Sequence, residues 1–326
     1  MSNTHRNVSV IGAAWGLGAP NPGCGDGPDV LKSIGLVQAI GAQRAHVGWL
    51  GTVHADSKGS LDSQIARACS TLADVVTGVV ARGDLALVVG GDHTCAVGTW
   101  TGAADAVAGD AAGDGGPLGL LWIDAHLDSH VPSTSPSNAL HGMPLACLLG
   151  RGETPLCAGR AVVRPEHVCV VGARSFEPAE AELLMRLGVR VFPMAEIERR
   201  GLDAVVREAL RLVRTGTARF GITLDLDALD PRDAPGVGVP EPGGLRAAEL
   251  AAALHGIASD PALCALEVVE YDPSLDVAGR TVASLRAIVD AAFAQRRKTL
   301  LPVAAWAGGQ KARARETDDC DRQHVH

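Results

Sequence analysis

The sequence of 326 residues predicts a single α/β domain of three layers, in which helices cover both faces of a central, mainly parallel β-sheet. Two observations predict this fold class. Short apolar runs with strand character alternate along the chain with longer segments of helical composition. Side chains of the types that bind metals follow three of these runs, and parallel sheets collect their ligands at the carboxyl ends of strands.

The strand-like runs are short and continuously apolar, as expected for strands that are buried on both faces. They cover residues 8–11, 85–89, 118–123, 168–171, 189–192, 220–226 and 266–269. The segments between them are rich in Ala, Leu, Arg and Glu, which favour helices. Helices are therefore expected at residues 61–80, 178–187, 202–213, 245–257 and 281–294.

Two long segments rich in Gly, Pro or Ser, residues 19–28 and 129–144, predict loops. Loops of this size in a compact domain are usually functional. Because no interdomain linker or internal repeat is apparent, residues 1–307 are expected to form one domain. The polar segment 308–326 lacks hydrophobic periodicity and predicts a flexible C-terminal tail.

The composition excludes several classes of protein. A formal net charge of −8 and the lack of a basic cluster argue against nucleic-acid binding. No apolar run is long enough to predict a membrane span, and the N-terminus does not resemble a signal peptide. The eight cysteines form no Cys-x-x-Cys pair, which favours reduced thiols over a disulfide framework. These features predict a cytoplasmic protein.

The metal-type side chains follow a regular pattern. Residues 90–93 (Gly-Gly-Asp-His) and 124–128 (Asp-Ala-His-Leu-Asp) each follow a predicted strand, and residues 225–227 (Asp-Leu-Asp) end a third. Residues i, i+2 and i+4 of an extended chain lie on one face, so the alternating ligands point together. The candidate metal ligands are His93, Asp124, His126, Asp128, Asp225 and Asp227.

This set of two imidazoles and four carboxylates favours hard divalent ions such as Mn²⁺, with Zn²⁺, Fe²⁺, Co²⁺ and Ni²⁺ as alternatives. The carboxylates would repel one another in an empty pocket, and two divalent ions would balance them. Two such ions about 3.5–4 Å apart lower the pKa of a shared water molecule. We interpret the isolated acids Asp92, Asp230 and Asp272 as loop residues or helix caps and not as metal ligands, because single Asp residues are common in turns and at helix caps.

These motifs resemble those of the ureohydrolase (arginase/agmatinase) family. The resemblance extends from Val8 to about Ile288, and it rests on the order and wide spacing of the motifs at residues 90–93, 124–128 and 225–231. Residues 235–245 (PGVGVPEPGGL) resemble the loop that follows the third motif. The resemblance is greatest to the arginases. It implies an arginase-like fold and a homo-oligomer, commonly a trimer or hexamer.

The resemblance also implies a binuclear centre with two Mn²⁺ ions per chain. The residues that would bind one ion are His93, Asp124, Asp128 and Asp225. The residues that would bind the other are Asp124, His126, Asp225 and Asp227, so two of the aspartates bridge the ions. The implied reaction is hydrolysis of a guanidinium group to urea and an amine, by attack of a metal-bridging hydroxide.

Three residues would take part directly in this reaction. Asp128 is implied to be catalytic as well as a metal ligand. Glu270, in the segment 268–273 (VVEYDP), matches the family's guanidinium-pairing carboxylate, and such a charge-assisted pair is strong. His141 matches the family's proton-shuttling histidine, and the leaving amine needs a proton.

The resemblance favours L-arginine, cleaved to urea and L-ornithine. The segment between Asp128 and His141 has the length found in arginases. Within it, Ser135, Ser137 and His130 are implied to bind the α-carboxylate of the substrate, directly or through water. Agmatine has no carboxylate, so these donors favour an amino acid over agmatine.

Glu177 and Glu180 are implied to bind the α-ammonium group, although both also suit the first turn of a helix. The chain departs from the family at several of these positions. His130 replaces an Asn typical of arginases, Glu177 replaces a shorter Asp, and Val237 and Val239 stand where the family often has Thr. These departures keep open another ureohydrolase activity, such as that of an agmatinase or a guanidinobutyrase.

An alternative from a different class is a non-catalytic binding protein that keeps the metals for structure. Glu270 and His141 argue against it, because a structural metal site needs neither residue. Metal-dependent deacetylases have a related fold, but their single-metal pattern does not explain His93 together with Asp225 and Asp227.

Overall fold

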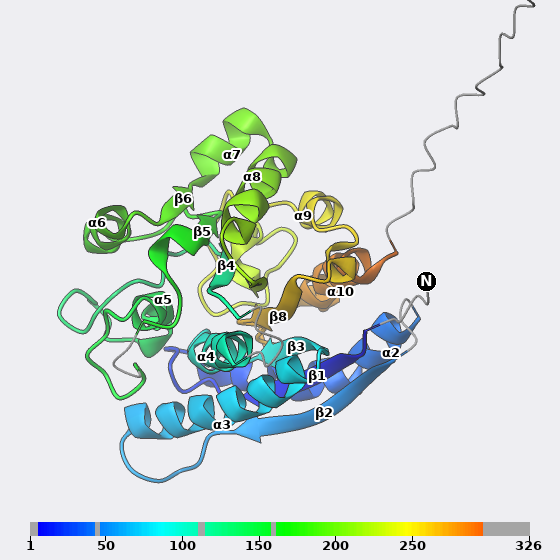
Figure 1. Cartoon of the computed structure of the whole chain (residues 1–326), viewed down its shortest axis with the longest axis horizontal. Coiled ribbons are helices and arrows are strands. Elements are labelled where there is room, and N and C mark those ends of the chain that lie inside the picture. Colours follow the sequence, from blue (N-terminus) through cyan, green and yellow to red (C-terminus); the bar gives the residue numbers. More distant parts are fainter. Residues whose placement is uncertain (1–5, 43–45, 110–114, 158–160, 296–326) are drawn as a thin grey trace, which may run out of the picture. The chain divides into compact units, whose positions relative to one another are not determined.

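Eight strands form one sheet in the part of the chain that the computed structural model describes, which is residues 6–42, 46–109, 115–157 and 161–295 (Figure 1). The strand order is β2-β1-β3-β8-β7-β4-β5-β6, and all neighbouring strands are parallel. The strands are β1 Val8–Ala14, β2 Val47–His54, β3 Leu85–Gly90, β4 Leu118–Ile123, β5 Val168–Val171, β6 Arg190–Phe192, β7 Arg219–Asp225 and β8 Leu263–Val269. The predicted parallel sheet is confirmed.

Helices connect the strands and cover both faces of the sheet (Figure 1). They are α1 Gly27–Ser33, α2 Leu36–Gly41, α3 Leu61–Ala81, α4 Cys95–Ala108, α5 Pro144–Leu148, α6 Pro178–Leu187, α7 Met194–Arg200, α8 Leu202–Arg214, α9 Ala247–Ala253 and α10 Arg280–Phe293. Four of the predicted helices are reproduced to within a residue at each end. The segment predicted as a helix over 245–257 holds only α9 and a short 3₁₀ turn, Ile257–Ser259.

The sheet separates two hydrophobic cores, which confirms the three-layer architecture. Strand β3 shows the division, because alternate side chains of a strand point to opposite faces. Leu85 and Leu87 belong to the core that includes residues of α8, α9 and α10. Ala86 and Val88 belong to the core that includes residues of α3, α4 and α5. Each strand buried on both faces therefore reads as a continuous apolar run.

Helix α4 is absent from the sequence-based prediction because its glycines and threonines disfavour a helix in isolation. Its glycines are needed for packing. A β-carbon on Gly98 would lie 2.6 Å from the carbonyl oxygen of Cys69, and one on Gly102 would lie 2.3 Å from that of Ala73. Both carbonyls belong to α3, so the two helix backbones approach as closely as they do only because side chains are absent here. Tertiary packing outweighs helix propensity in this segment.

The expectation of reduced thiols is wrong for one pair, because a disulfide joins Cys147 to Cys157. Cys147 belongs to α5, and the chain folds back on this helix through the backbone bonds Arg151 N–Ala146 O and Val162 N–Leu148 O. That return, which cysteine spacing does not reveal, places the two residues together. The remaining cysteines of the described residues, Cys24, Cys69, Cys95, Cys169 and Cys264, are free and buried.

Across the described ranges, no helix has both the length and the apolar character needed to traverse a membrane. The described residues belong to one compact unit, Met1–Gln295. The predicted tail, residues 308–326, lies outside the described residues, so the domain limits at 307 and 308 stay a prediction.

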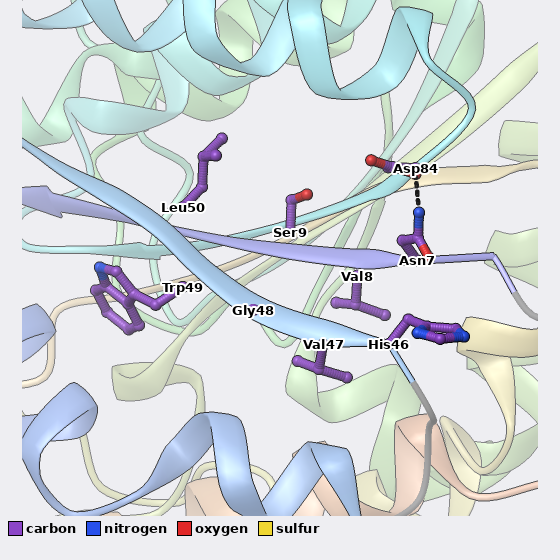
Figure 2. Close-up of a pocket in the computed structure, with 9 residues that line it drawn as sticks. All are labelled: Asn7, Val8, Ser9, His46, Val47, Gly48, Trp49, Leu50 and Asp84. Atoms are coloured by element: carbon purple, nitrogen blue, oxygen red, sulfur yellow. Dashed lines mark hydrogen bonds between the residues drawn. The ribbon is translucent and has the colours of Figure 1, made fainter.

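An open hollow of about 340 Å³ lies at the opposite edge of the sheet from the predicted ligands (Figure 2). Its lining includes Asn7 and Val8 at the start of β1, His46 and Val47 at the start of β2, and Asp84 just before β3. Asn7 donates a hydrogen bond to Asp84 there. The groups of potential metal ligands found among the described residues lie elsewhere, so this hollow is not the predicted site.

Candidate metal centre and active site

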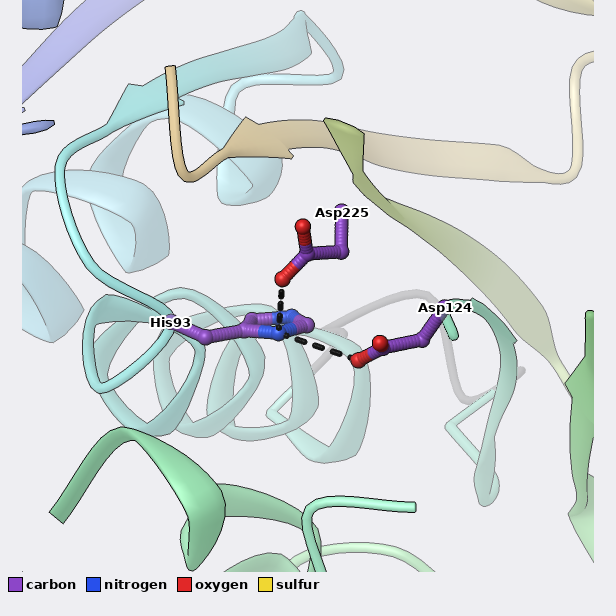
Figure 3. Close-up of side chains that lie close together, drawn as sticks. All are labelled: His93, Asp124 and Asp225. Atoms are coloured by element: carbon purple, nitrogen blue, oxygen red, sulfur yellow. Dashed lines mark ion pairs between the residues drawn. The ribbon is translucent and has the colours of Figure 1, made fainter. Parts of the chain in front are cut away.

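Adjacent strands bring the predicted ligands together at the carboxyl edge of the sheet. Strands β3, β8, β7 and β4 are consecutive neighbours, and each of them ends at or just before a predicted site residue. Figure 3 shows His93, Asp124 and Asp225 pointing toward one another from three separate segments. We call the six predicted ligands the floor of the site: His93, Asp124, His126, Asp128, Asp225 and Asp227. All are buried except His126, whose side chain is 23% exposed.

His93 faces three carboxylates of the floor. Its Nδ1 atom lies 3.3 Å from Oδ2 of Asp124, 2.9 Å from Oδ2 of Asp128 and 3.1 Å from Oδ2 of Asp225. This Nδ1 is nevertheless buried without a hydrogen bond, because none of the three oxygens meets it in hydrogen-bond geometry. These are the residues that the resemblance assigns to one metal ion.

His126 faces the remaining part of the floor. Its Nδ1 lies 3.5 Å from Oδ1 of Asp124 and 3.1 Å from Oδ2 of Asp227. Asp124 therefore directs one oxygen toward each histidine, which is the arrangement that a bridging carboxylate requires. Asp225 directs Oδ2 toward His93, while its Oδ1 accepts a hydrogen bond from the amide of Asp227.

The donor atoms fit divalent metal ions. The Nε2 atom of His93 lies 3.2 Å from Oγ1 of Thr223, and that hydroxyl donates to Oε2 of the buried Glu267. Since the only hydroxyl hydrogen of Thr223 goes to Glu267, Nε2 carries a hydrogen, and Nδ1 is the ring nitrogen left to bind a metal ion. Burial alone would lower the pKa of His93, but the three carboxylates raise it well above its ordinary value, so this part of the floor favours a positive charge. Metal-bound histidines commonly donate their second N–H to a neighbouring acceptor in this way.

The electrostatics of the floor also favour bound cations. Burial and the nearby charge of Asp124 raise the pKa of Asp128 to about 6. Burial, together with Asp227 and Asp124, raises the pKa of Asp225 well above its ordinary value. The ionised carboxylates therefore destabilise one another in the metal-free protein, and divalent ions would remove this repulsion.

Glu270 and His141 form a pair beside the floor. Oε1 of Glu270 accepts the amide hydrogen of His93 at 2.9 Å and lies 3.0 Å from Nδ1 of His141. Burial alone would lower the pKa of His141, but the bond to Glu270 raises it to about 9. Burial alone would raise the pKa of Glu270, but His141 and the His93 amide hold it below its ordinary value. The pair thus consists of a protonated imidazole and an ionised carboxylate.

Two residues of the site have left-handed backbones, and that of Glu270 is strained. Asp128 has a φ of +46° and Glu270 a φ of +65°. This left-handed region is unfavourable for residues other than Gly, Asn and Asp. Such strain concentrates at functional sites, where the surrounding structure holds the side chain in a required direction.

The predicted substrate residues form what we call the rim of the site: His130, Ser135, Ser137, Glu177 and Glu180. At the rim, Nε2 of His130 lies 2.8 Å from Oε2 of Glu177 and 3.2 Å from Oε2 of Glu180. Glu177 and Glu180 also form a capping box at the start of α6, as the simpler interpretation of these residues expects. The hydrogen bond from His130 lowers the pKa of Glu177, whereas burial raises the pKa of Glu180 to about 8.

The two serines of the rim bind their own loop. Oγ of Ser135 accepts the amide hydrogen of Asn138 at 3.0 Å, and Oγ of Ser137 accepts that of Ala139 at 3.2 Å. Ser137 is exposed and Ser135 half-buried. Each hydroxyl keeps its own hydrogen, which leaves it able to donate to a substrate carboxylate.

Several residues that sequence reasoning missed support the site. Thr223 and Glu267 orient His93, and a buried Glu inside an apolar strand was the available signal for Glu267. Arg174 donates to the carbonyl oxygens of Asp227 and Glu241, so it ties the third motif to the loop after it. Asp92 is a loop residue, as expected, which accepts the amide hydrogens of Gly18 and Thr94.

Comparison with known proteins agrees with this geometry. A model of the arginase family matches residues 6–294. The arginase of Brevibacillus brevis is 35% identical over 301 residues, which cover 89% of this chain and 98% of that protein. The arginase of Bacillus caldovelox is 33% identical over 304 residues, covering 89% and 99%. The crystal structure of arginase from Bacillus cereus superposes with a TM-score of 0.81 at 34% identity, covering 90% of this chain and 100% of that one.

The parallel sheet and the paired clusters of His and Asp at its carboxyl edge define an α/β protein with a candidate binuclear metal site. The chain belongs to the arginase family, which makes it an amidinohydrolase. The resemblance inferred from the three motifs is thereby confirmed.

Proposed function

We propose that this protein is a manganese-dependent hydrolase that cleaves L-arginine to urea and L-ornithine. The observation that carries the proposal is the buried Nδ1 of His93, which has no hydrogen bond and faces the carboxylates of Asp124, Asp128 and Asp225. The relatives that this chain matches over nearly their whole length are named arginases, which supports L-arginine as the substrate. As a further part of the proposal, the protein is a cytoplasmic homo-oligomer, a trimer or hexamer, in line with the resemblance of its motifs to those of the family.

The floor residues would hold two metal ions, and the preference of carboxylates and imidazoles for hard ions supports Mn²⁺. When bound, these ions would lower the pKa of water and so supply the nucleophile. Asp124 and Asp225 would bridge the ions, because Asp124 already directs one oxygen toward each histidine of the floor. Asp128 would bind the same ion as His93 and would lie next to the reacting carbon of the substrate.

Glu270 would bind the guanidinium group. The amide of His93 and Nδ1 of His141 both meet Oε1, so Oε2 is left for an N–H of the substrate. Gly238 leaves space on that side, since a β-carbon there would still be 4.0 Å from Oε2. The lowered pKa of Glu270 keeps the carboxylate ionised at neutral pH, as pairing with a guanidinium requires.

His141 would provide the proton that the leaving amine needs. Its pKa of about 9 means that the imidazole carries a proton near neutral pH, and Glu270 orients the ring through Nδ1. Nε2 is then the atom that can transfer a proton toward the substrate. After this transfer the ring can recover a proton from solvent, because 18% of the side chain is exposed.

The test is urea release by the Mn²⁺-loaded protein from L-arginine, agmatine and 4-guanidinobutyrate, with the metal content measured on the same sample. We expect two metal ions per chain, and a higher kcat/KM for L-arginine than for agmatine. One ion or fewer per chain would contradict the binuclear centre. If agmatine or 4-guanidinobutyrate is better than L-arginine by tenfold or more, only the family assignment survives.

A further inference from the structure

His130 lies beside the floor, and its ring is fully engaged with other side chains. It follows the proposed ligand Asp128 by two residues, so their Cα atoms are at most about 7 Å apart. Nε2 meets one oxygen of Glu177 and one of Glu180, while Nδ1 lies 3.1 Å from Oγ1 of Thr134. An imidazole nitrogen that faces two carboxylate oxygens carries its hydrogen, so His130 donates to Glu177 and lies within ion-pair distance of Glu180.

Other groups use the same carboxylates. Oε1 of Glu180 accepts the amide hydrogen of Ser129, and Oε2 accepts that of Glu177 at 3.0 Å as well as facing His130. The side chains of Glu180 and His130 are 4% and 9% exposed, whereas that of Glu177 is 52% exposed. The three side chains could in principle hold a cation, but within this network their polar atoms already satisfy one another.

We propose that His130 is a specificity-determining residue that weakens the selectivity of this enzyme for substrates with an α-ammonium group. The inference rests on the proposed function, because it concerns the end of the guanidino substrate remote from the reacting carbon. An α-ammonium that approaches Glu177 and Glu180 must compete with the Nε2 hydrogen of His130 for the same oxygens. Hydrogen bonds between charged groups otherwise raise affinity by roughly 10- to 100-fold.

The consequence is a broader substrate class than L-amino acids. Guanidino acids that lack the α-amino group, such as 5-guanidinopentanoate, leave the pair of His130 and Glu177 undisturbed. Their kcat/KM should be little lower than that of L-arginine, because the α-ammonium group of L-arginine adds little binding energy at Glu177 and Glu180. An Asn at position 130 is too short to keep both contacts, so it would release the carboxylates for an α-ammonium.

The experiment compares the Mn²⁺-loaded full-length protein with its His130→Asn variant. The kcat/KM for urea release is measured with L-arginine and 5-guanidinopentanoate. The Kd values of L-ornithine and 5-aminopentanoate are measured by calorimetry, which requires no catalysis. We expect wild-type preferences for the α-amino compounds below about 5-fold, and an increase of about 10-fold in both preferences in the variant.

Two further variants separate a specific effect from a structural one. His130→Asn/Glu177→Gln should lose the increase, because the freed carboxylate is gone. His255→Asn, at an exposed histidine beyond α9, should leave both preferences unchanged. Metal content measured in every variant shows that the floor is intact.

A wild-type preference above about 100-fold for the α-amino compounds would overturn the role of His130. So would unchanged preferences in His130→Asn with urea release intact. If no guanidino compound yields urea while the L-ornithine preference still increases, the role of His130 stands and the proposed function fails. If neither ligand binds to either protein, both are wrong.

Discussion

The floor and the rim of the site satisfy their polar side chains in opposite ways. On the floor, Nδ1 of His93 has no hydrogen bond and faces acids whose pKa values burial raises. At the rim, His130 and Glu177 satisfy each other directly. The floor is therefore the part of the site that divalent cations would complete, whereas the side chains of the rim pair with one another without a ligand. This difference implies that substitutions in the floor should abolish the reaction, whereas substitutions in the rim should change which substrate is preferred.

The largest effect should come from removing a bridging carboxylate of the floor. Asp124→Ala should lose most of both metal ions. His93→Ala should retain at least one more ion per chain than Asp124→Ala does, because Asp124 directs an oxygen toward each of the two histidines. Metal analysis after Mn²⁺ loading measures this difference, with Asp203→Ala, on the exposed face of α8, as the control. Equal metal contents in the two variants would show that Asp124 does not bridge.

The next largest effect should be on the rate of the reaction. His141→Ala should lower kcat for L-arginine by about 10²-fold with little change in KM, as the loss of a general acid–base group typically does. His54→Ala, at an exposed position of β2, serves as the control. An unchanged kcat would remove His141 from the mechanism.

A third prediction sharpens the comparison by testing the support of the floor. Thr223→Val removes the acceptor of His93 Nε2, so it should weaken Mn²⁺ binding by about 10- to 100-fold. Thr99→Val is a matched control, because it also removes a hydroxyl that donates to Glu267 but does not contact His93. If both variants bind Mn²⁺ equally, the orientation of His93 does not depend on Thr223.

A fourth prediction concerns the metal-free protein and pH. The folded state raises the pKa of His141 from 6.5 to about 9, so the pair with Glu270 stabilises the fold fully below pH 6.5. This contribution, at most ~3 kcal/mol, is lost as pH rises to about 9. The stability difference between the wild type and His141→Asn, measured by urea unfolding without metal, should therefore shrink over this interval. A difference that grows with pH would contradict the pairing.

The smallest effect is expected at the exposed part of the rim. Ser137→Ala should raise KM for L-arginine by only about 3- to 10-fold, because one hydrogen bond at an exposed site contributes ~0.5–1.5 kcal/mol. Ser133→Ala, exposed in the same loop, should not change KM. An effect of Ser137→Ala as large as that of His141→Ala would abolish the distinction between floor and rim.

The floor was predictable from the sequence because it depends on local geometry. The apolar run before Asp124 predicts a strand over residues 118–123, which are the bounds of β4, and alternation along the chain then groups Asp124, His126 and Asp128. The same reasoning gives β5, residues 168–171, and helix α6, residues 178–187. In these segments pattern, propensity and burial agree.

The pairing of the rim side chains and elements such as β2 and α4 were not predictable because they depend on tertiary contacts. His130 and Glu177 are 47 residues apart in the chain, and only folding places them 2.8 Å apart. Strand β2, residues 47–54, contains two glycines and is half exposed at the edge of the sheet, so no apolar run marks it. Helix α4 forms because α3 packs against its glycines, which a local pattern cannot show.

The positive φ angle of Glu270 places a limit on how far this protein can be stabilised by engineering. A sequence chosen for thermostability alone would carry Gly or Asn there, since a left-handed residue of another type costs roughly 1–2 kcal/mol. At position 270 that choice would remove the carboxylate proposed to bind the guanidinium. A screen for heat resistance alone should therefore recover proteins with Gly at 270 that are more thermostable but inactive.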